Sequence, residues 1–296
     1  MAAQQAAFRG AFEISLPSGR TLALGPRTLV MGIVNVTPDS FAGGVTDPDE
    51  AAAVAMRMEA DGADIIDIGG ESTRPGAHPV LEREELARVL PVLRRLKNHL
   101  RIPISIDTYK AGVASSAIEA GACIVNDISG LGYDPMLGGV VAQTGAGLVL
   151  MHTRGRSRDM YRDAAYADVL AEVAAELKQA LARAVAAGVS RAQVILDPGI
   201  GFAKRAEHSL TLVAKLSDLA SLGRPLLVGP SRKSFLAEAI GTLQPAERDW
   251  GTAAAVTAAV MAGAHIVRVH SVAAMVQVVR VADAIRQQAG VADTIP

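Results

Sequence analysis

The chain has 296 residues and a formal net charge of −1, from 29 basic and 30 acidic residues. A chain of this length buries about 75% of the surface that its unfolded form exposes, so one large core is possible without disulfides. The nearly neutral charge argues against a nucleic-acid-binding protein with a basic face. Its one cysteine cannot form an internal disulfide, and no signal peptide or membrane-spanning run of apolar residues is visible. We therefore expect a cytoplasmic protein without a membrane partner.

The first predicted element is a β-hairpin over residues 12–25, "FEISLPSGRTLALG". Phe12, Ile14 and Leu16 alternate with polar residues, which indicates a strand with one buried face, and Pro17-Ser18-Gly19 provides the turn. We expect this hairpin to close one end of the domain that follows. Residues 1–27 are thus predicted to be an N-terminal extension and hairpin within the same domain.

After the hairpin, eight short apolar runs alternate with helical stretches. The glycines of "DGADIID", "AGACIVND", "TGAGLVLMH" and "AGAHIVRVH" fit left-handed residues that end a helix just before a buried strand. The clearest helices are 166–188 and one that starts at Asp47, an N-cap followed by Pro48. The predicted strands span residues 28–37, 64–70, 102–108, 123–129, 147–152, 193–199, 225–231 and 265–270.

Continuous apolar strands that alternate with helices are typical of a parallel sheet covered by helices. Eight such units in about 250 residues predict an α/β fold, a single-domain (β/α)₈ TIM barrel over residues 28–290. An open, doubly wound sheet is the alternative. No linker, low-complexity tract or charge run suggests a second domain.

Polar residues follow or end every predicted strand. In a (β/α)₈ barrel the carboxyl ends of all eight strands meet at one mouth, where the catalytic site is built. Each residue alone has a simpler explanation, because a strand-end Asp often caps the next helix and a single His is often structural. The full set predicts a site, and its members are Asn35, Glu71–Arg74, Asp107, Asn126, Asp127, His152, Asp197, Ser231–Ser234, Arg268 and His270.

The types of these side chains indicate the class of ligand. Asp107, Asn126 and Asp197 offer hydrogen-bond acceptors and an amide to a flat heterocycle, whereas Arg268, His270 and their cationic neighbours suit a phosphate or carboxylate. The sequence contains no Walker loop, no dinucleotide fingerprint and no zinc-type His/Cys spacing. A small heterocyclic phosphoester is therefore the expected ligand, and no nucleic acid is expected.

The order and wording of the motifs resemble the dihydropteroate synthase family of folate biosynthesis over residues 12–290. The motifs are "MGIVNVTPDSF", "DIGGESTRPGA", "SIDT", "VNDISG", "LMH", "ILDPGIGFAK", "SRKSF" and "VRVH". The resemblance implies the condensation of 6-hydroxymethyl-7,8-dihydropterin diphosphate with p-aminobenzoate to dihydropteroate and diphosphate. It also implies Mg²⁺ as the cofactor and a homodimer formed through barrel helices.

The resemblance also implies roles for individual residues. It assigns catalysis to Asp107, Lys233, Arg268 and His270. It assigns the pterin diphosphate to Asn35, Thr73, Asp107, Asn126, Met151, Asp197, Lys233, Arg268 and His270, with Asn35 as the metal ligand. It assigns p-aminobenzoate to Phe41, Arg74, Pro75, Phe202 and Ser234. A dissociative reaction through a pterin cation is expected, without a required general base.

One departure from the family pattern lies in the first loop. After "TPDSF" the family usually has Ser-Asp-Gly-Gly, whose aspartate helps to stabilise the cation, but this chain has Ala42-Gly43-Gly44. Asp39 or Asp47 is a candidate replacement. The missing carboxylate leaves a non-catalytic pterin-diphosphate-binding protein as one alternative, and a pterin-dependent methyltransferase domain is the other.

Overall fold

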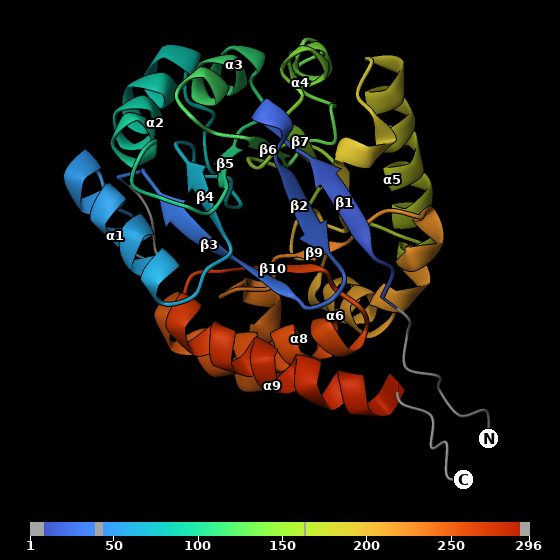
Figure 1. Cartoon of the computed structure of the whole chain (residues 1–296). Helices are drawn as coiled ribbons and strands as arrows, with labels where there is room; N and C mark the ends of the chain where they lie inside the picture. The colour runs from blue at the N-terminus through green and yellow to red at the C-terminus, as the bar shows by residue number, and fades with distance from the viewer. Residues whose placement is uncertain (1–8, 39–43, 163, 291–296) are drawn as a thin grey trace, which may run out of the picture.

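The computed structural model describes residues 9–38, 44–162 and 164–290. Helices surround a central ring of parallel strands, as expected for a (β/α)₈ barrel (Figure 1). The strands are β1 Phe12–Ser15, β2 Thr21–Leu24, β3 Leu29–Asn35, β4 Ile65–Gly69, β5 Ile104–Asp107, β6 Ile124–Asp127, β7 Gly147–Met151, β8 Val194–Asp197, β9 Leu227–Val228 and β10 Ile266–Val269. The helices are α1 Pro48–Ala60, α2 Glu82–Leu96, α3 Ala111–Glu119, α4 Leu137–Thr144, α5 Val169–Ala186, α6 Ala206–Ala214, α7 Ala237–Ile240, α8 Asp249–Met261 and α9 Val272–Gly290.

The eight parallel strands form a closed ring. Their order is β8-β7-β6-β5-β4-β3-β10-β9, and every neighbouring pair is parallel. The ring closes between β8 and β9, where Leu196 forms a parallel bridge to Leu226 and its N–H donates to the Pro225 carbonyl at 2.9 Å. The alternative of an open sheet is therefore excluded.

The hairpin β1–β2 closes the end of the barrel where the strands begin, as the sequence predicted (Figure 1). Its buried Ile14, Leu16 and Leu24 pack in one cluster with the first inward-facing residues of the barrel strands, among them Met31 and Ile124. This inner core also contains Cys123, which is buried and free. The amino-terminal end of the barrel is thus filled by apolar side chains and leaves only the opposite end for a ligand.

Most predicted boundaries differ by a few residues for identifiable reasons. α1 begins after Asp47, whose side chain caps two backbone N–H groups, as predicted. α5 begins at Val169 and not at residue 166, because the Asp168 side chain accepts from Leu170 and Ala171 and so marks the N-cap. Val185 is exposed, because a strict spacing of four residues drifts around a helix that has 3.6 residues per turn.

β9 is much shorter than the predicted strand at 225–231. Only Leu227 and Val228 form ladder pairs, and Pro230, which lacks a backbone N–H, follows two residues after the strand ends. The chain from this point forms a loop at the carboxyl end of the barrel, so the early end of β9 lengthens the segment that is available for a site. Within the described part of the chain, no helix is long and apolar enough to cross a membrane.

Candidate active site

A cavity of about 420 Å³ lies at the carboxyl ends of the barrel strands. Fourteen of the residues that the sequence assigned to a site line it, and these are Asn35, Glu71, Ser72, Thr73, Arg74, Pro75, Asp107, Phe202, Ser231, Arg232, Lys233, Ser234, Arg268 and His270. The predicted residues Asn126, Met151 and Asp197 are buried and do not line the open volume. Phe41, together with Ala42 and Gly43 of the altered loop, lies outside the described residues.

Strand periodicity explains which of these side chains point toward the barrel axis. Ile65, Ile124 and Ile266 belong to the inner core, and side chains two residues later along a strand lie on the same face. Asp67 on β4, Asn126 on β6 and Arg268 on β10 therefore face inward one layer higher. The same step from Ile195 reaches Asp197, and the step from Val149 reaches Met151. We refer to Asp67, Asp107, Asn126 and Asp197 as the polar floor.

Arg268 lies between two carboxylates of the polar floor. Its Nε donates to Asp67 Oδ2 at 2.6 Å, and its Nη2 donates to Asp107 Oδ2 at 2.7 Å. Burial raises the pKa of Asp107 to about 7, although the Arg268 charge favours its ionised form. Asp107 Oδ1 makes no hydrogen bond among those found in the described residues and remains an acceptor for a ligand above this layer.

Asp67 is a site residue that the sequence analysis missed. It is fully buried, and its Oδ2 accepts from both Arg268 and the Asn126 side-chain amide, the latter at 2.9 Å. Since the amide Nδ2 of Asn126 is used in this bond, its Oδ1 is left as an acceptor. Asp67 stands in the middle of "DIIDIGG" and not at its end, so only its inward parity with Ile65 could have revealed it.

Lys233 connects the polar floor to the loop between β8 and α6. Its Nζ donates to the Ile200 carbonyl at 2.5 Å and lies 4.4 Å from the centre of the Phe202 ring. Burial lowers the pKa of Lys233 to about 8, against the opposing effect of the nearby Asp197 carboxylate. Burial also raises the pKa of Asp197, whose Oδ1 accepts from the Gly199 N–H at 2.7 Å. Lys233 and Asp197 therefore place a hydrogen-bond donor beside a buried acceptor.

His270 is neutral, which differs from the cationic role that its sequence position suggested. Burial, followed by the charge of Arg268, lowers its pKa to about 3. Its Nδ1 lies 2.9 Å from Ser231 Oγ, and its backbone N–H donates to the same oxygen at 3.2 Å. If Nδ1 accepts the Ser231 proton, Nε2 carries the ring proton, and His270 offers a neutral N–H donor to the cavity.

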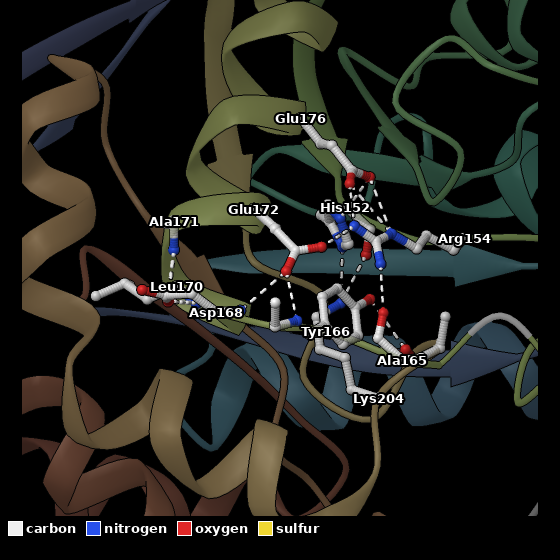
Figure 2. A network of polar contacts seen from close by, with 12 residues as sticks. His152, Arg154, Ala165, Tyr166, Asp168, Leu170, Ala171, Glu172, Glu176 and Lys204 are labelled. Carbon is white, nitrogen blue, oxygen red and sulfur yellow. Dashed lines mark hydrogen bonds and ion pairs between the residues drawn. The ribbon is translucent and has the colours of Figure 1, made fainter.

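His152 does not belong to the cavity, although it ends a strand. It follows the inward-facing Met151 directly, so its side chain points to the opposite face of the sheet, toward the helices. Figure 2 shows it against Glu176 of α5, with His152 Nε2 and Glu176 Oε2 3.0 Å apart. Arg154 pairs with the same glutamate and with Glu172. Asp127, which follows Asn126, is likewise outward-facing and accepts from Ser129 and Leu131.

The outer part of the cavity is built by loops. Phe202 and Ser234 line it together with the 73–75 segment, as assigned from the motifs. Loop residues that the sequence analysis did not assign also contribute, and they are Met160, Tyr161, Thr242, Leu243, Gln244, Pro245 and Arg248. They carry no motif and come from long connections after β7 and β9, which explains why strand-end reasoning did not find them.

Asn35 is the only residue that was assigned as a metal ligand, and its surroundings suit a metal ion that is bound jointly by the protein and the substrate. It ends β3, lines the cavity, and its side-chain amide has no hydrogen-bond partner among those found in the described residues. Across the described ranges, no three His, Cys, Asp or Glu side chains are grouped to hold a metal by themselves. Mg²⁺ commonly keeps several waters and takes one or two protein oxygens together with substrate phosphates. The residues fit a cation that arrives with a diphosphate.

Known proteins resemble this chain over almost its entire length. The family model described as "Pterin binding enzyme" matches residues 31–270. The dihydropteroate synthase of Synechocystis sp. is 49% identical over 277 residues, which is 93% of this chain and 96% of that protein. The structure of Yersinia pestis dihydropteroate synthase in a sulfonamide complex superposes with a TM-score of 0.88 at 41% identity and covers 93% of this chain and 100% of the other. Burkholderia cenocepacia dihydropteroate synthase, complexed with 7,8-dihydropteroate, gives 0.84 at 41% identity, with 94% and 98% covered.

Proposed function

This chain belongs to the family of pterin-binding enzymes, and on that premise we propose that it is a dihydropteroate synthase. It joins 6-hydroxymethyl-7,8-dihydropterin diphosphate to p-aminobenzoate and releases 7,8-dihydropteroate and diphosphate. The observation that best supports this function is the polar floor, in which Arg268 lies between two largely buried carboxylates and the cavity above is lined by further basic side chains. A heterocycle with N–H and amino donors fits the floor, and its anionic ester fits the basic and neutral donors beside it.

The pterin is proposed to bind by its ring edge. Asp107, Asn126 and Asp197 accept from the ring and amino N–H groups, and Lys233 donates to the ring oxygen and nitrogen. Met151 packs with Phe202 beside this layer. Asp67 holds Asn126 with its oxygen available to the ligand. A ligand that leaves a buried acceptor without a hydrogen bond loses binding free energy. The floor therefore favours a ring whose N–H groups match all of its acceptors.

The diphosphate is proposed to lie beside the polar floor, near Asn35, Thr73, Arg268 and His270. Thr73 and His270 offer neutral donors to its oxygens, and Arg268 offers positive charge. Asn35 would contribute an oxygen to Mg²⁺, which when bound with the diphosphate would neutralise charge that develops on the leaving oxygen. p-Aminobenzoate is proposed to occupy the outer cavity between Pro75 and Phe202, with its carboxylate near Ser234 and Arg74, and Phe41 is assigned there from its motif.

The reaction is proposed to be dissociative. The bond between the pterin methylene carbon and the diphosphate oxygen breaks, and its electron pair leaves with the diphosphate. The resulting positive charge is shared by the dihydropterin ring, where Asp107 and Asp197 stabilise it. The arylamine nitrogen then donates its lone pair to the methylene carbon and loses a proton to water. Because the cation is reactive, no residue needs to act as a general base.

Two measurements test this function. The purified protein, with Mg²⁺ and both substrates, should form dihydropteroate, whereas Asp197→Asn should not reach the wild-type rate. Without p-aminobenzoate, ¹⁸O placed between the methylene carbon and phosphorus should move into non-bridging positions, because bond cleavage is reversible. Binding of the pterin ester without any product would instead identify the non-catalytic homologue, and methyl transfer from a pterin would identify the methyltransferase. Product without isotope scrambling would refute the dissociative step.

A homodimer in the cytoplasm is the remaining part of the proposal. α8 and α9 pack against each other, and α9 exposes Val281 and Ile285 one turn apart, with 61% and 53% of their surfaces accessible. Trp250, at the start of α8, is 88% exposed. These side chains support a contact between two copies. Sedimentation velocity should show a dimer for the wild type and a monomer for Ile285→Glu.

A further inference from the structure

The loop between β8 and α6 has an unusual backbone. Gly199 and Gly201 have positive φ angles of 69° and 79°, and Ala203 has a φ of 49°. A positive φ is uncommon for a residue with a side chain, and Ala203 is fully buried. Backbone of this kind persists only where the surroundings hold it in place.

Lys204 supplies much of that hold from behind the loop. Its Nζ donates to the Phe202 carbonyl at 2.9 Å and lies 3.3 Å from the His152 carbonyl and 2.8 Å from His152 Nδ1. Lys204 is only 2% exposed, which is rare for a lysine and requires such partners. Tyr166 holds the next carbonyl, since its hydroxyl donates to Ala203 at 3.0 Å. Two consecutive loop carbonyls are therefore fixed from the side opposite the cavity.

The contacts around His152, drawn in Figure 2, indicate the charge and the tautomer of its ring. Burial lowers the pKa of His152 to about 4, so the ring is neutral. Its Nε2 lies beside the Glu176 carboxylate, which can only accept a hydrogen bond, so Nε2 carries the ring proton and Nδ1 is the acceptor for Lys204. Arg154 pairs with Glu176 and lies 4.1 Å from the centre of the Tyr166 ring. Hydrogen bonds and ion pairs thereby connect α5, the end of β7 and the loop between β8 and α6.

On its other side, the same loop faces the cavity. Phe202 and Gly201 line it, and the Phe202 ring lies beneath Lys233 Nζ. The start of the loop is held independently, because Gly199 N–H donates to Asp197 and Phe202 N–H donates to the Gly199 carbonyl. Loss of Lys204 would therefore free the Phe202 end of the loop more than the Gly199 end.

We propose that Lys204, together with Tyr166, is a positioning element that sets the Phe202 side of the second-substrate pocket from outside the cavity. This inference rests on the proposed dihydropteroate synthase activity. Neither side chain touches the cavity, and neither reacts. They act on p-aminobenzoate through the backbone of Phe202 and Ala203, whereas the acceptors for the pterin edge remain on the strands.

The test compares the two substrates in Lys204→Met, which keeps an unbranched side chain one atom shorter than lysine and removes its donors. The KM for p-aminobenzoate should rise by about tenfold or more, since small displacements of positioning groups have effects of this size. The dissociation constant of the pterin diphosphate, measured by calorimetry, should equal that of the wild type. Equal losses for both substrates, or an unchanged KM in the folded variant, would overturn the proposal.

Arg183→Met is the matched control. Arg183 of α5 also holds a loop carbonyl, that of Gly130, at 2.9 Å, but this loop does not line the cavity. Its two KM values should stay at wild-type levels, and a selective rise for p-aminobenzoate would overturn the proposal. If Lys204→Met does not fold, Tyr166→Phe should give a smaller rise in the same KM, and no selective rise would refute the positioning role. A wild-type protein that forms no dihydropteroate would instead refute the activity, which the unmodified enzyme reports separately.

Discussion

Replacing Asp67 by Asn should weaken binding of the pterin diphosphate without a matching loss of stability. The variant keeps the shape of the side chain but removes the charge that Arg268 Nε contacts at 2.6 Å. It also offers a second amide to Asn126, so that the Asn126 amide can turn and present its N–H₂ group to ring donors. The substitution thus disturbs a cation and an acceptor of the polar floor while leaving the core volume unchanged.

The expected size of the effect follows from the contacts that remain. A hydrogen bond to a charged group contributes about 1.5–3 kcal/mol. Arg268 retains its second bond, to Asp107 at 2.7 Å, so a loss of about 2 kcal/mol is a reasonable expectation, still within that range. At about 1.4 kcal/mol for each factor of ten, the dissociation constant should rise about thirtyfold. Folding loses less, because Asp67 Oδ1 of the wild type is already buried without a hydrogen-bond partner among the described residues.

Calorimetry with the pterin diphosphate and thermal unfolding without ligand measure the two effects separately. Asp127→Asn is the matched control, since Asp127 is equally buried but accepts from Ser129 and Leu131 and faces away from the cavity. It should lower the unfolding midpoint and leave pterin affinity unchanged. The reasoning about Asp67 is refuted if Asp67→Asn binds as tightly as the wild type, or if both variants show the same pattern.

Other perturbations test the remaining parts of the site. Burial raises the pKa of Asp107 to about 7 and lowers that of Lys233 to about 8. The kcat/KM for the pterin diphosphate should therefore decrease below about pH 7, as Asp107 is protonated, and above about pH 8, as Lys233 is deprotonated. A flat profile from pH 6 to pH 9, about one unit beyond each pKa, would contradict this. His270→Ala should weaken the diphosphate ester more than the corresponding alcohol in calorimetry, and equal losses would place His270 outside the diphosphate site. Gly199→Ala should lower the thermal midpoint and activity together, because a Cβ there would lie 1.9 Å from the His152 carbonyl oxygen and φ is +69°; wild-type values for both would disprove the need for glycine.

The barrel was predictable because its signals are local and repeated. Left-handed glycines such as Gly121 and Gly145, with φ angles of 119° and 70°, end helices just before buried strands, as the sequence indicated. Eight repetitions of a helix followed by a strand are compatible with few topologies. The inner face of the hairpin follows from the alternation of apolar and polar residues. Local signals do not determine where the pairing between strands stops, and β9 ends at Val228, two residues before Pro230. The division of the chain at residues 27 and 28 stays a prediction.

The candidate site was only partly predictable, because a polar strand end can face either the barrel axis or the helices. Counting in steps of two from an inner-core residue separates these cases: Asn126 faces inward and Asp127 outward. The same count moves His152 out of the cavity and brings Asp67 into it. Periodicity thus carries information that a search for polar residues after each strand leaves unused.

Periodicity cannot, however, identify the partners that decide the chemistry. Arg268 and Asp67 are 201 residues apart in sequence, and their contact exists only because β4 and β10 both face the same axis. The charge of Arg268 is partly neutralised by this contact, so its role cannot be deduced from its motif alone. Lys204 lies in a loop, where no strand count applies, and one of its partners is the His152 ring, whose other nitrogen contacts Glu176 of α5. A basic side chain found in a motif can therefore serve the ligand or the backbone, and only the acceptors around it distinguish the two.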